Sequence, residues 1–238
     1  MAIANRYLRF AKISEARFRA LLRCFALDLT ATQAAAMTGI SVRRTNDLFL
    51  RIRNRLAFEC GKVSPFHGDL EADESYFGPG RVRGKRGRGA GNKTVVFGLL
   101  KREDRVYTEI VPNVSRATLR AVIRGHADLN SVIHTDGWSG YDGLVDLGYE
   151  RHRRVNHGKN EFALGPNHIN GIESFWGYAK HRLTKVHGVN RKTFPPHLKE
   201  TEFRFNLTLP AQNVSLSELL KWRKGNANEE WEVGQVHA

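Results

Sequence analysis

The hydrophobic pattern changes once along the chain, and this change divides it into two parts. Up to about residue 58, apolar residues recur at the spacing of helices; from about residue 66, they alternate or form short runs typical of strands. We therefore predict a small all-α domain over residues 1–60 and an α/β domain over residues 66–208. Residues 209–238 are expected to form a C-terminal helix and a loose polar tail.

The first part carries the pattern of a helix-turn-helix. Thr30 and Gln33 form a capping-box pair before a short alanine-rich helix, Gly39 ends that helix, and Ser41 can cap the next one. The expected apolar stripe of the second helix is Val42, Thr45, Phe49, Ile52 and Leu56, and its other face carries Arg43, Arg44, Asn46, Arg51, Arg53 and Arg55. Such a helix can enter the major groove of DNA. The alternative is a helical hairpin whose basic face has no ligand.

The second part has the pattern of a mixed α/β sheet. Strands are predicted at 67–77, 93–102, 105–112, 131–137 and 150–157, with the second and third forming a hairpin. Helices are predicted at 115–127, 168–183 and, after Pro195 and Pro196, 197–207. Three strands, a helix, more strands and covering helices are typical of this fold class.

The charge of the chain favours an anionic partner. Its formal net charge is +14, which makes nucleic acid the first candidate. The segment 78–93 contains glycines and basic residues without an acid, so we expect a flexible arm or a long hairpin tip that contacts the DNA backbone. Its candidate contacts are Arg81, Arg83, Lys85, Arg86, Arg88 and Lys93. A solvated basic loop is the alternative.

Two classes of protein are disfavoured by what the sequence lacks. Cys24 and Cys60 are the two cysteines, and neither belongs to a CxxC pair, which argues against a disulfide framework and a cysteine-based zinc site. No apolar run reaches the roughly 18 residues of a membrane span, and the first residues have no signal-peptide pattern. We expect a cytoplasmic protein without a membrane partner, at the nucleoid when bound to DNA.

Acidic residues alternate along the predicted strand 67–77. Because side chains alternate between faces with period two, Asp69, Glu71 and Asp73 share one face of that strand. A buried carboxylate is costly unless it is solvated, paired or bound to metal. The strand is therefore a candidate for a catalytic or metal-binding element.

Two further acids lie at positions suited to a site. Asp136 ends an apolar strand, where ligand sites collect in open α/β sheets. Glu173 lies early in the helix 168–183, and Lys180 follows two turns later on nearly the same face. Asp73, Asp136 and Glu173 could together hold two Mg²⁺ ions, because carboxylate oxygens suit Mg²⁺ or Mn²⁺. Taken singly, each acid is more often a surface, capping or turn residue.

Three motifs in order resemble a known family. "EADESYFG" before the basic segment, then "HTDGWSGY", then "NHINGIESFWGYAKHRL" resemble the DDE transposases of bacterial insertion sequences, within them the ISXO-like group and particularly its shorter members. The resemblance covers about residues 66–208. It implies an RNase H-like catalytic core, the triad Asp73, Asp136 and Glu173, and a contact of Lys180 with DNA near the scissile phosphate. Many longer relatives carry a zinc ribbon with CxxC pairs, which this chain lacks.

These features lead to one function hypothesis and two rivals. We expect the helix-turn-helix to bind the terminal inverted repeats of double-stranded DNA, and two Mg²⁺ or Mn²⁺ ions to support strand cleavage and strand transfer to target DNA. A homodimer or larger synaptic complex is expected because two ends must be cut together. The rivals are a structure-selective nuclease that cuts without joining and a non-catalytic DNA-binding regulator.

Other polar and aromatic residues near the motifs have open roles. His134, His168 and His181 form no zinc-binding pattern and are expected to give polar support or contact DNA. Trp138 and Tyr141 could stack on an unpaired base or pack in the core.

Overall fold

The computed structural model describes residues 12–61, 65–78, 93–136, 138–142, 144, 148–149, 151–155, 169–186 and 189–208. These form two compact units, of which residues 12–61 and 185–200 make the first, and residues 65–184 and 201–208 the second. The candidates Arg81, Arg83, Lys85, Arg86 and Arg88 lie outside the described residues, as do His168 and the predicted C-terminal helix and tail. None of the helices in the described ranges has the length and apolar character that a membrane span needs.

The first unit contains the helices on which the helix-turn-helix prediction rests. Helix α1 (Glu15–Ala26) precedes α2 (Ala31–Thr38) and α3 (Val42–Cys60). Thr30 and Gln33 form the expected capping box, in which each side chain binds the other residue's backbone N–H. Gly39 ends α2 with a φ of 66°, a left-handed conformation that glycine adopts readily, and the Ser41 side chain caps α3.

The buried stripe of α3 differs at its start from the prediction. Thr45, Phe49, Ile52 and Leu56 are buried as expected, but Val42 is 42% exposed. Val42 is the first residue of α3, and side chains in helices point toward the N-terminus, so its side chain extends past the packed turns.

Arg53 belongs to the interior of the first unit, which corrects its placement on the solvent face. Its Nε donates to Glu200 Oε2 at 2.6 Å, and the Glu200 side chain is 1% exposed. Its guanidinium also lies over the rings of Phe25 and Phe49. Arg55 pairs with Glu59 one turn later. The exposed basic face of α3 is therefore smaller than the sequence pattern indicated.

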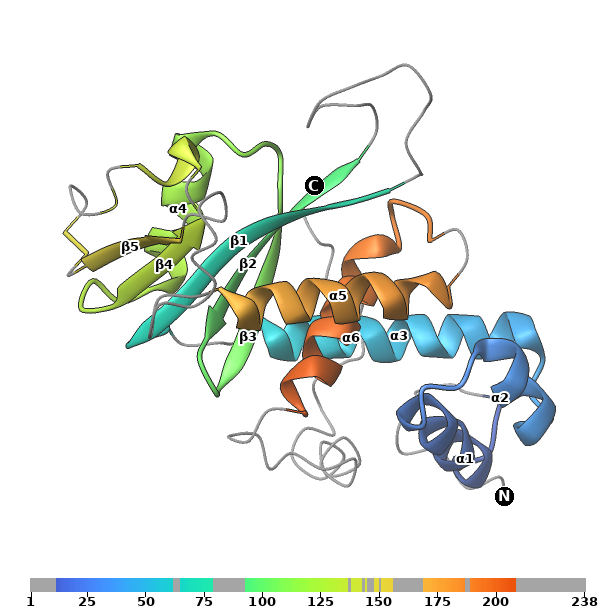
Figure 1. The fold of residues 1–238 in the computed structure, drawn as a ribbon. Coiled ribbons are helices and arrows are strands. Elements are labelled where there is room, and N and C mark those ends of the chain that lie inside the picture. Colours follow the sequence, from blue (N-terminus) through green and yellow to red (C-terminus); the bar gives the residue numbers. More distant parts are fainter. Residues whose placement is uncertain are drawn as a thin grey trace, which may run out of the picture. The chain divides into compact units, whose positions relative to one another are not determined.

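The second unit contains the predicted mixed sheet. Its strands are β1 (Asp69–Phe77), β2 (Thr94–Lys101), β3 (Arg105–Val111), β4 (Val132–Asp136) and β5 (Arg151–Val155), in the order β3-β2-β1-β4-β5. β1, β2 and β3 pair antiparallel, whereas β4 is parallel to β1 and β5 parallel to β4 (Figure 1). The predicted mixed α/β class and the helical N-terminal region are confirmed.

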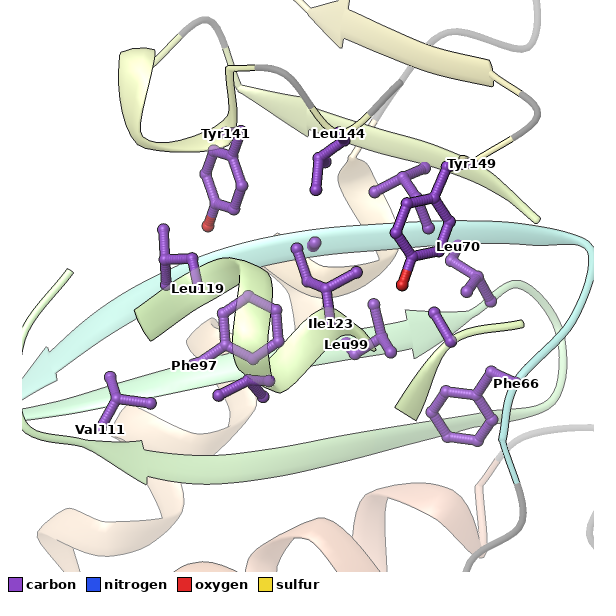
Figure 2. Packing of buried hydrophobic residues seen from close by; sticks show 14 residues of the cluster. Phe66, Leu70, Phe97, Leu99, Val111, Leu119, Ile123, Tyr141, Leu144 and Tyr149 are labelled. Atoms are coloured by element: carbon purple, nitrogen blue, oxygen red, sulfur yellow. The ribbon is translucent and has the colours of Figure 1, made fainter. Parts of the chain in front are cut away.

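An apolar core covers one face of this sheet. Helix α4 (Arg116–His126) packs Leu119, Val122 and Ile123 onto strand residues that include Leu70 and Phe97. Figure 2 shows this cluster between α4 and the strands, closed at one end by Tyr141 from the short helix η1 (Ser139–Tyr141). Because strand side chains alternate, the residues between these apolar ones face the other way.

Helix α5 (Asn170–Thr184) crosses β1 and β2 on that other face (Figure 1). It buries Ile172, Phe175, Trp176, Ala179 and Arg182. Helix α6 (Phe194–Asn206) starts earlier than expected. Its first turn includes Pro195 and Pro196, which a helix tolerates there because N–H groups of the first turn have no intrahelical partner.

Candidate active site

The register of β1 and β4 places Asp73 beside Asp136. The two strands are parallel, with Glu71 opposite His134 and Ala72 opposite Thr135, so the next step along both strands reaches the two aspartates. Residues opposite each other in a sheet point to the same face. Both aspartates therefore lie on the face that α5 crosses, away from the apolar core.

Asp73 lies in a largely desolvated, negatively charged environment. Its Oδ2 accepts a hydrogen bond of 3.0 Å from the indole Nε1 of Trp176. Burial, then the negative charges of Glu74 and Asp136, raise the pKa of Asp73 to about 7, and the Trp176 hydrogen bond offsets part of that rise. A carboxyl in such surroundings favours either a proton or a cation as its partner.

Asp136 sits where β4 ends and the chain turns. Its Oδ1 accepts a hydrogen bond of 3.0 Å from the backbone N–H of Trp138, two residues on, which holds the turn. The strand end is the feature by which the sequence singled out this position.

Glu173 lies in the first turn of α5 and its side chain is exposed. Within the described ranges, no three His, Cys, Asp or Glu side chains come close enough together to hold a metal ion. The structure thus brings Asp73 and Asp136 together, and Glu173 does not complete a three-carboxylate cluster with them. The assignment of the triad stays a prediction.

Glu71 has a role that the sequence did not reveal. Its carboxylate is 1% exposed; Oε1 accepts from Arg102 Nε at 2.9 Å and Oε2 from the Ile172 backbone N–H at 3.0 Å. The second bond satisfies a donor in the first turn of α5. A Cβ on Gly171 would lie 2.9 Å from Glu71 Oε2, so a glycine there permits the contact.

Asp69, the third acid on this face, pairs with a histidine. His134 Nε2 and Asp69 Oδ1 are 2.7 Å apart, and this hydrogen bond is the main reason that the pKa of Asp69 is lowered. Burial lowers the pKa of His134. The alternation of Asp69, Glu71 and Asp73 indicated a shared face, but the separate partners of these acids depend on β2, β4 and α5.

The predicted DNA contacts that the structure describes differ in their surroundings. Lys180 on α5 is exposed, as are Lys93 before β2 and Arg43, Asn46 and Arg51 on α3. Asp47 lies 2.7 Å from Arg44 and 3.6 Å from Arg51, so both arginines already face a carboxylate.

Tyr141 packs in the core, which excludes it as a base-stacking residue. Its ring is fully buried and its hydroxyl donates to Glu74 Oε2 at 2.8 Å. Trp138 is partly buried and meets the Tyr141 ring edge to face. His134 supports Asp69, as the polar alternative predicted, and His181 is exposed on α5.

The family of the chain follows from a match over most of its α/β part. Residues 65–206 match the ISXO2-like transposase domain family. The chain belongs to the ISXO2-like transposases. The predicted resemblance is confirmed, and the two aspartates that the motifs singled out lie inside the matched segment of this transposase.

Two curated relatives agree with this assignment. The transposase is 41% identical over 118 residues to an uncharacterized transposase-like protein of Haemophilus influenzae, a match that covers 49% of this chain and 94% of the relative. It is 31% identical over 154 residues to an uncharacterized protein in transposable element ISH50 of Halobacterium salinarum, covering 58% of this chain and 52% of that protein. This chain therefore spans about half the length of the second relative.

Among solved structures, the catalytic core domain of BIV integrase matches with a TM-score of 0.38 and 12% identity, over 65% of this chain and 97% of that one. A similarity of this size adds nothing to the family match.

Proposed function

We propose that this transposase binds the ends of its own element and carries out metal-dependent cleavage of DNA and its transfer to a target. The observation that carries the proposal is the register of β1 and β4, which brings Asp73 and Asp136 to neighbouring positions on adjacent parallel strands, on the sheet face crossed by α5. Carboxylates from neighbouring strands and a covering helix are suited to phosphoryl transfer with hard divalent ions.

The donor set fits Mg²⁺ or Mn²⁺. Asp73 and Asp136 offer carboxylate oxygens, and the raised pKa of Asp73 indicates that nearby groups do not neutralise its charge. These two residues, joined by Glu173 from α5, would hold the ions. When bound, two such ions would activate an attacking oxygen and stabilise the leaving oxygen of the phosphodiester.

The chain's own cations would bind and orient DNA. Lys180 is exposed two turns beyond Glu173 on α5, where its ammonium could neutralise a phosphate close to the scissile bond. On α3, Arg43 and Asn46 are exposed near the start of the helix, the part of a recognition helix that contacts base edges. Arg44, Arg51, Lys93 and the basic segment 78–93 would contact the backbone. Because two element ends must be cut together, we propose a homodimer or a larger synaptic complex.

The test of catalysis uses purified protein, labelled element-end DNA and a plasmid target, with Mg²⁺ or EDTA. Wild type should give joined products with Mg²⁺ and none with EDTA. Asp136→Asn should still bind the ends and lose cleavage by at least about 1,000-fold, an effect expected when a metal ligand is removed. The matched control is Asp104→Asn, whose carboxylate pairs with Lys101 in the turn between β2 and β3; it should join DNA like wild type.

The other outcomes identify the rivals. Cutting without joining would identify a nuclease, and binding without cutting would leave a DNA-binding regulator.

The test of end recognition compares two arginines of α3. Arg43→Ala should weaken binding to element ends by about 1–3 kcal/mol and weaken binding to unrelated DNA less, because a contact with a base edge carries sequence information. Arg55→Ala is the control because Arg55 pairs with Glu59 at 2.6 Å within the same helix. Equal losses in both variants would contradict a recognition role for the start of α3.

A further inference from the structure

The strand position opposite Asp73 is a glycine that leaves room for an indole ring. Asp73 pairs with Gly98 across β1 and β2. A Cβ at Gly98 would lie 2.6 Å from Trp176 Cζ2, 2.9 Å from Trp176 Cη2 and 2.8 Å from Ile172 Cδ1. The glycine therefore lets α5 approach the sheet so closely that the Trp176 ring occupies the space of the missing side chain.

Trp176 is held tightly in that space. The residue is 4% exposed, and its ring meets the rings of Phe77 and Phe175 at centroid distances of 6.1 and 4.9 Å. The indole N–H can only donate a hydrogen bond, and here it donates to Asp73 Oδ2 at 3.0 Å. Packing on several sides fixes the ring, and the fixed ring fixes one oxygen of the carboxylate.

A second bond holds the same helix to the same strand. The Ile172 N–H donates to Glu71 Oε2, so α5 is attached to two alternate acids of β1, at Glu71 and at Asp73. Glu173 lies between these attachment points in the helix sequence. The two bonds together define where the start of α5 lies along β1.

We propose that Trp176, in the space left by Gly98, is a positioning residue for Asp73: its indole N–H holds one carboxylate oxygen so that the other is directed to the divalent ion. This rests on the proposed function, in which Asp73 and Asp136 hold that ion. Residues that hydrogen-bond a metal ligand commonly contribute 10-fold to 100-fold to metal affinity. We expect an effect of about 10-fold because a single bond is involved.

The experiment measures metal binding directly. Mn²⁺ is titrated into wild type, Trp176→Phe and Phe205→Leu, free Mn²⁺ is followed by electron paramagnetic resonance, and the Tm of each protein is recorded. Trp176→Phe keeps a buried ring but removes the donor, and should weaken Mn²⁺ binding about 10-fold. Phe205→Leu is the matched control: Phe205 is a buried aromatic of α6 that packs on Phe175 and Tyr178, so its variant should lose stability and keep Mn²⁺ affinity.

A second pair of variants tests the role of the space. Gly98→Ala keeps the donor but displaces the ring, so it should weaken Mn²⁺ binding as Trp176→Phe does. The double variant combines Gly98→Ala with Trp176→Phe. The phenyl ring at position 176 lacks the two indole carbons, Cζ2 and Cη2, that lie nearest to the new methyl group at position 98. The Mn²⁺ affinity of the double variant should therefore be no lower than that of Trp176→Phe alone, a non-additive result that reports direct coupling.

The outcomes separate this inference from the proposed function. Asp136→Asn is the reference for a lost site. If it loses Mn²⁺ while Trp176→Phe and Gly98→Ala bind like wild type, the positioning role is overturned and the metal site stands. Equal losses of Mn²⁺ affinity in Trp176→Phe and Phe205→Leu also overturn it. If wild type binds no Mn²⁺, or binds it no better than Asp136→Asn, both proposals fail.

Discussion

The two faces of the sheet are built from the same strands and differ in almost every other respect. The face toward α4 carries Leu70, Ala72, Phe97, Leu99 and Ile133. The face toward α5 carries Glu71, Asp73, Gly98, His134 and Asp136. On the first face, α4 is held by apolar packing, which tolerates the replacement of one apolar side chain by another of similar shape. On the second face, α5 is held by apolar packing and also by hydrogen bonds to individual carboxylates. Hydrogen bonds are directional, so they fix the position of the helix more narrowly. One face stabilises the fold, and the other gives α5 a definite place beside the two aspartates.

The largest expected change in stability comes from the apolar face. Phe97→Ala should lower the free energy of unfolding by about 4 kcal/mol, because it removes a fully buried ring and leaves a cavity. Chemical denaturation measures the loss. Protein that remains folded should bind Mn²⁺ with unchanged affinity; a large loss of affinity would show that the two faces are not independent.

A somewhat smaller loss is expected at the anchor of α5. Glu71→Ala should lower the free energy of unfolding by about 3 kcal/mol, because Arg102 and the Ile172 N–H lose a buried acceptor. Glu71→Gln keeps an acceptor for Ile172 and should lose only about 1 kcal/mol. Denaturant titration of both variants tests this, and equal losses would contradict the hydrogen bond to α5 as the reason.

Asp73→Asn should raise stability, and the gain should depend on pH. The pKa of Asp73 is about 7 in the folded chain against 3.8 for the unperturbed group, so the folded state binds the proton more tightly. The contribution of Asp73 to the stability of wild type is therefore largest below about pH 4 and is lost as pH rises to about 7, by about 2 kcal/mol after allowance for partial solvation. Without metal, Asp73→Asn should be the more stable protein at pH 8 and equal to wild type at pH 4.

Thermal unfolding at both pH values measures this difference, with Asp104→Asn as the control. Adding Mg²⁺ at pH 8 should raise the Tm of wild type and leave that of Asp73→Asn unchanged. If the difference in Tm between wild type and Asp73→Asn were the same at pH 4 and pH 8, the charge of Asp73 could not be its cause.

The smallest effect is expected where an apolar-face residue contacts an acid. Tyr141→Phe should lower the free energy of unfolding by about 1 kcal/mol, because it deletes the hydrogen bond to Glu74 and keeps the buried ring. Burial raises the pKa of Tyr141 well above its ordinary value, so the hydroxyl stays protonated and the effect should not vary between pH 6 and pH 9. Urea denaturation at both pH values checks it, and a loss above about 3 kcal/mol would indicate a larger role for this contact.

Local patterns predicted much of the fold because they depend on residues close together in the chain. The capping box at Thr30, the left-handed end of α2 at Gly39 and the five strands were all found from short-range spacing. Two of the errors occurred at element ends. Val42 is exposed because it starts a helix, and α6 includes its two prolines because a first turn accepts them.

The sequence alone also determined the family, the mixed α/β class and the shared face of Asp69, Glu71 and Asp73. The order and spacing of the motifs, and the alternation of side chains along a strand, are properties of the chain itself. Only the tertiary structure decided how these acids differ. Glu71 anchors α5, Asp69 pairs with His134, and Asp73 lies beside Asp136 under Trp176. Partners of this kind come from strands and helices far apart in the chain, and their contacts exist only once the strand register and the approach of α5 at Gly98 are set.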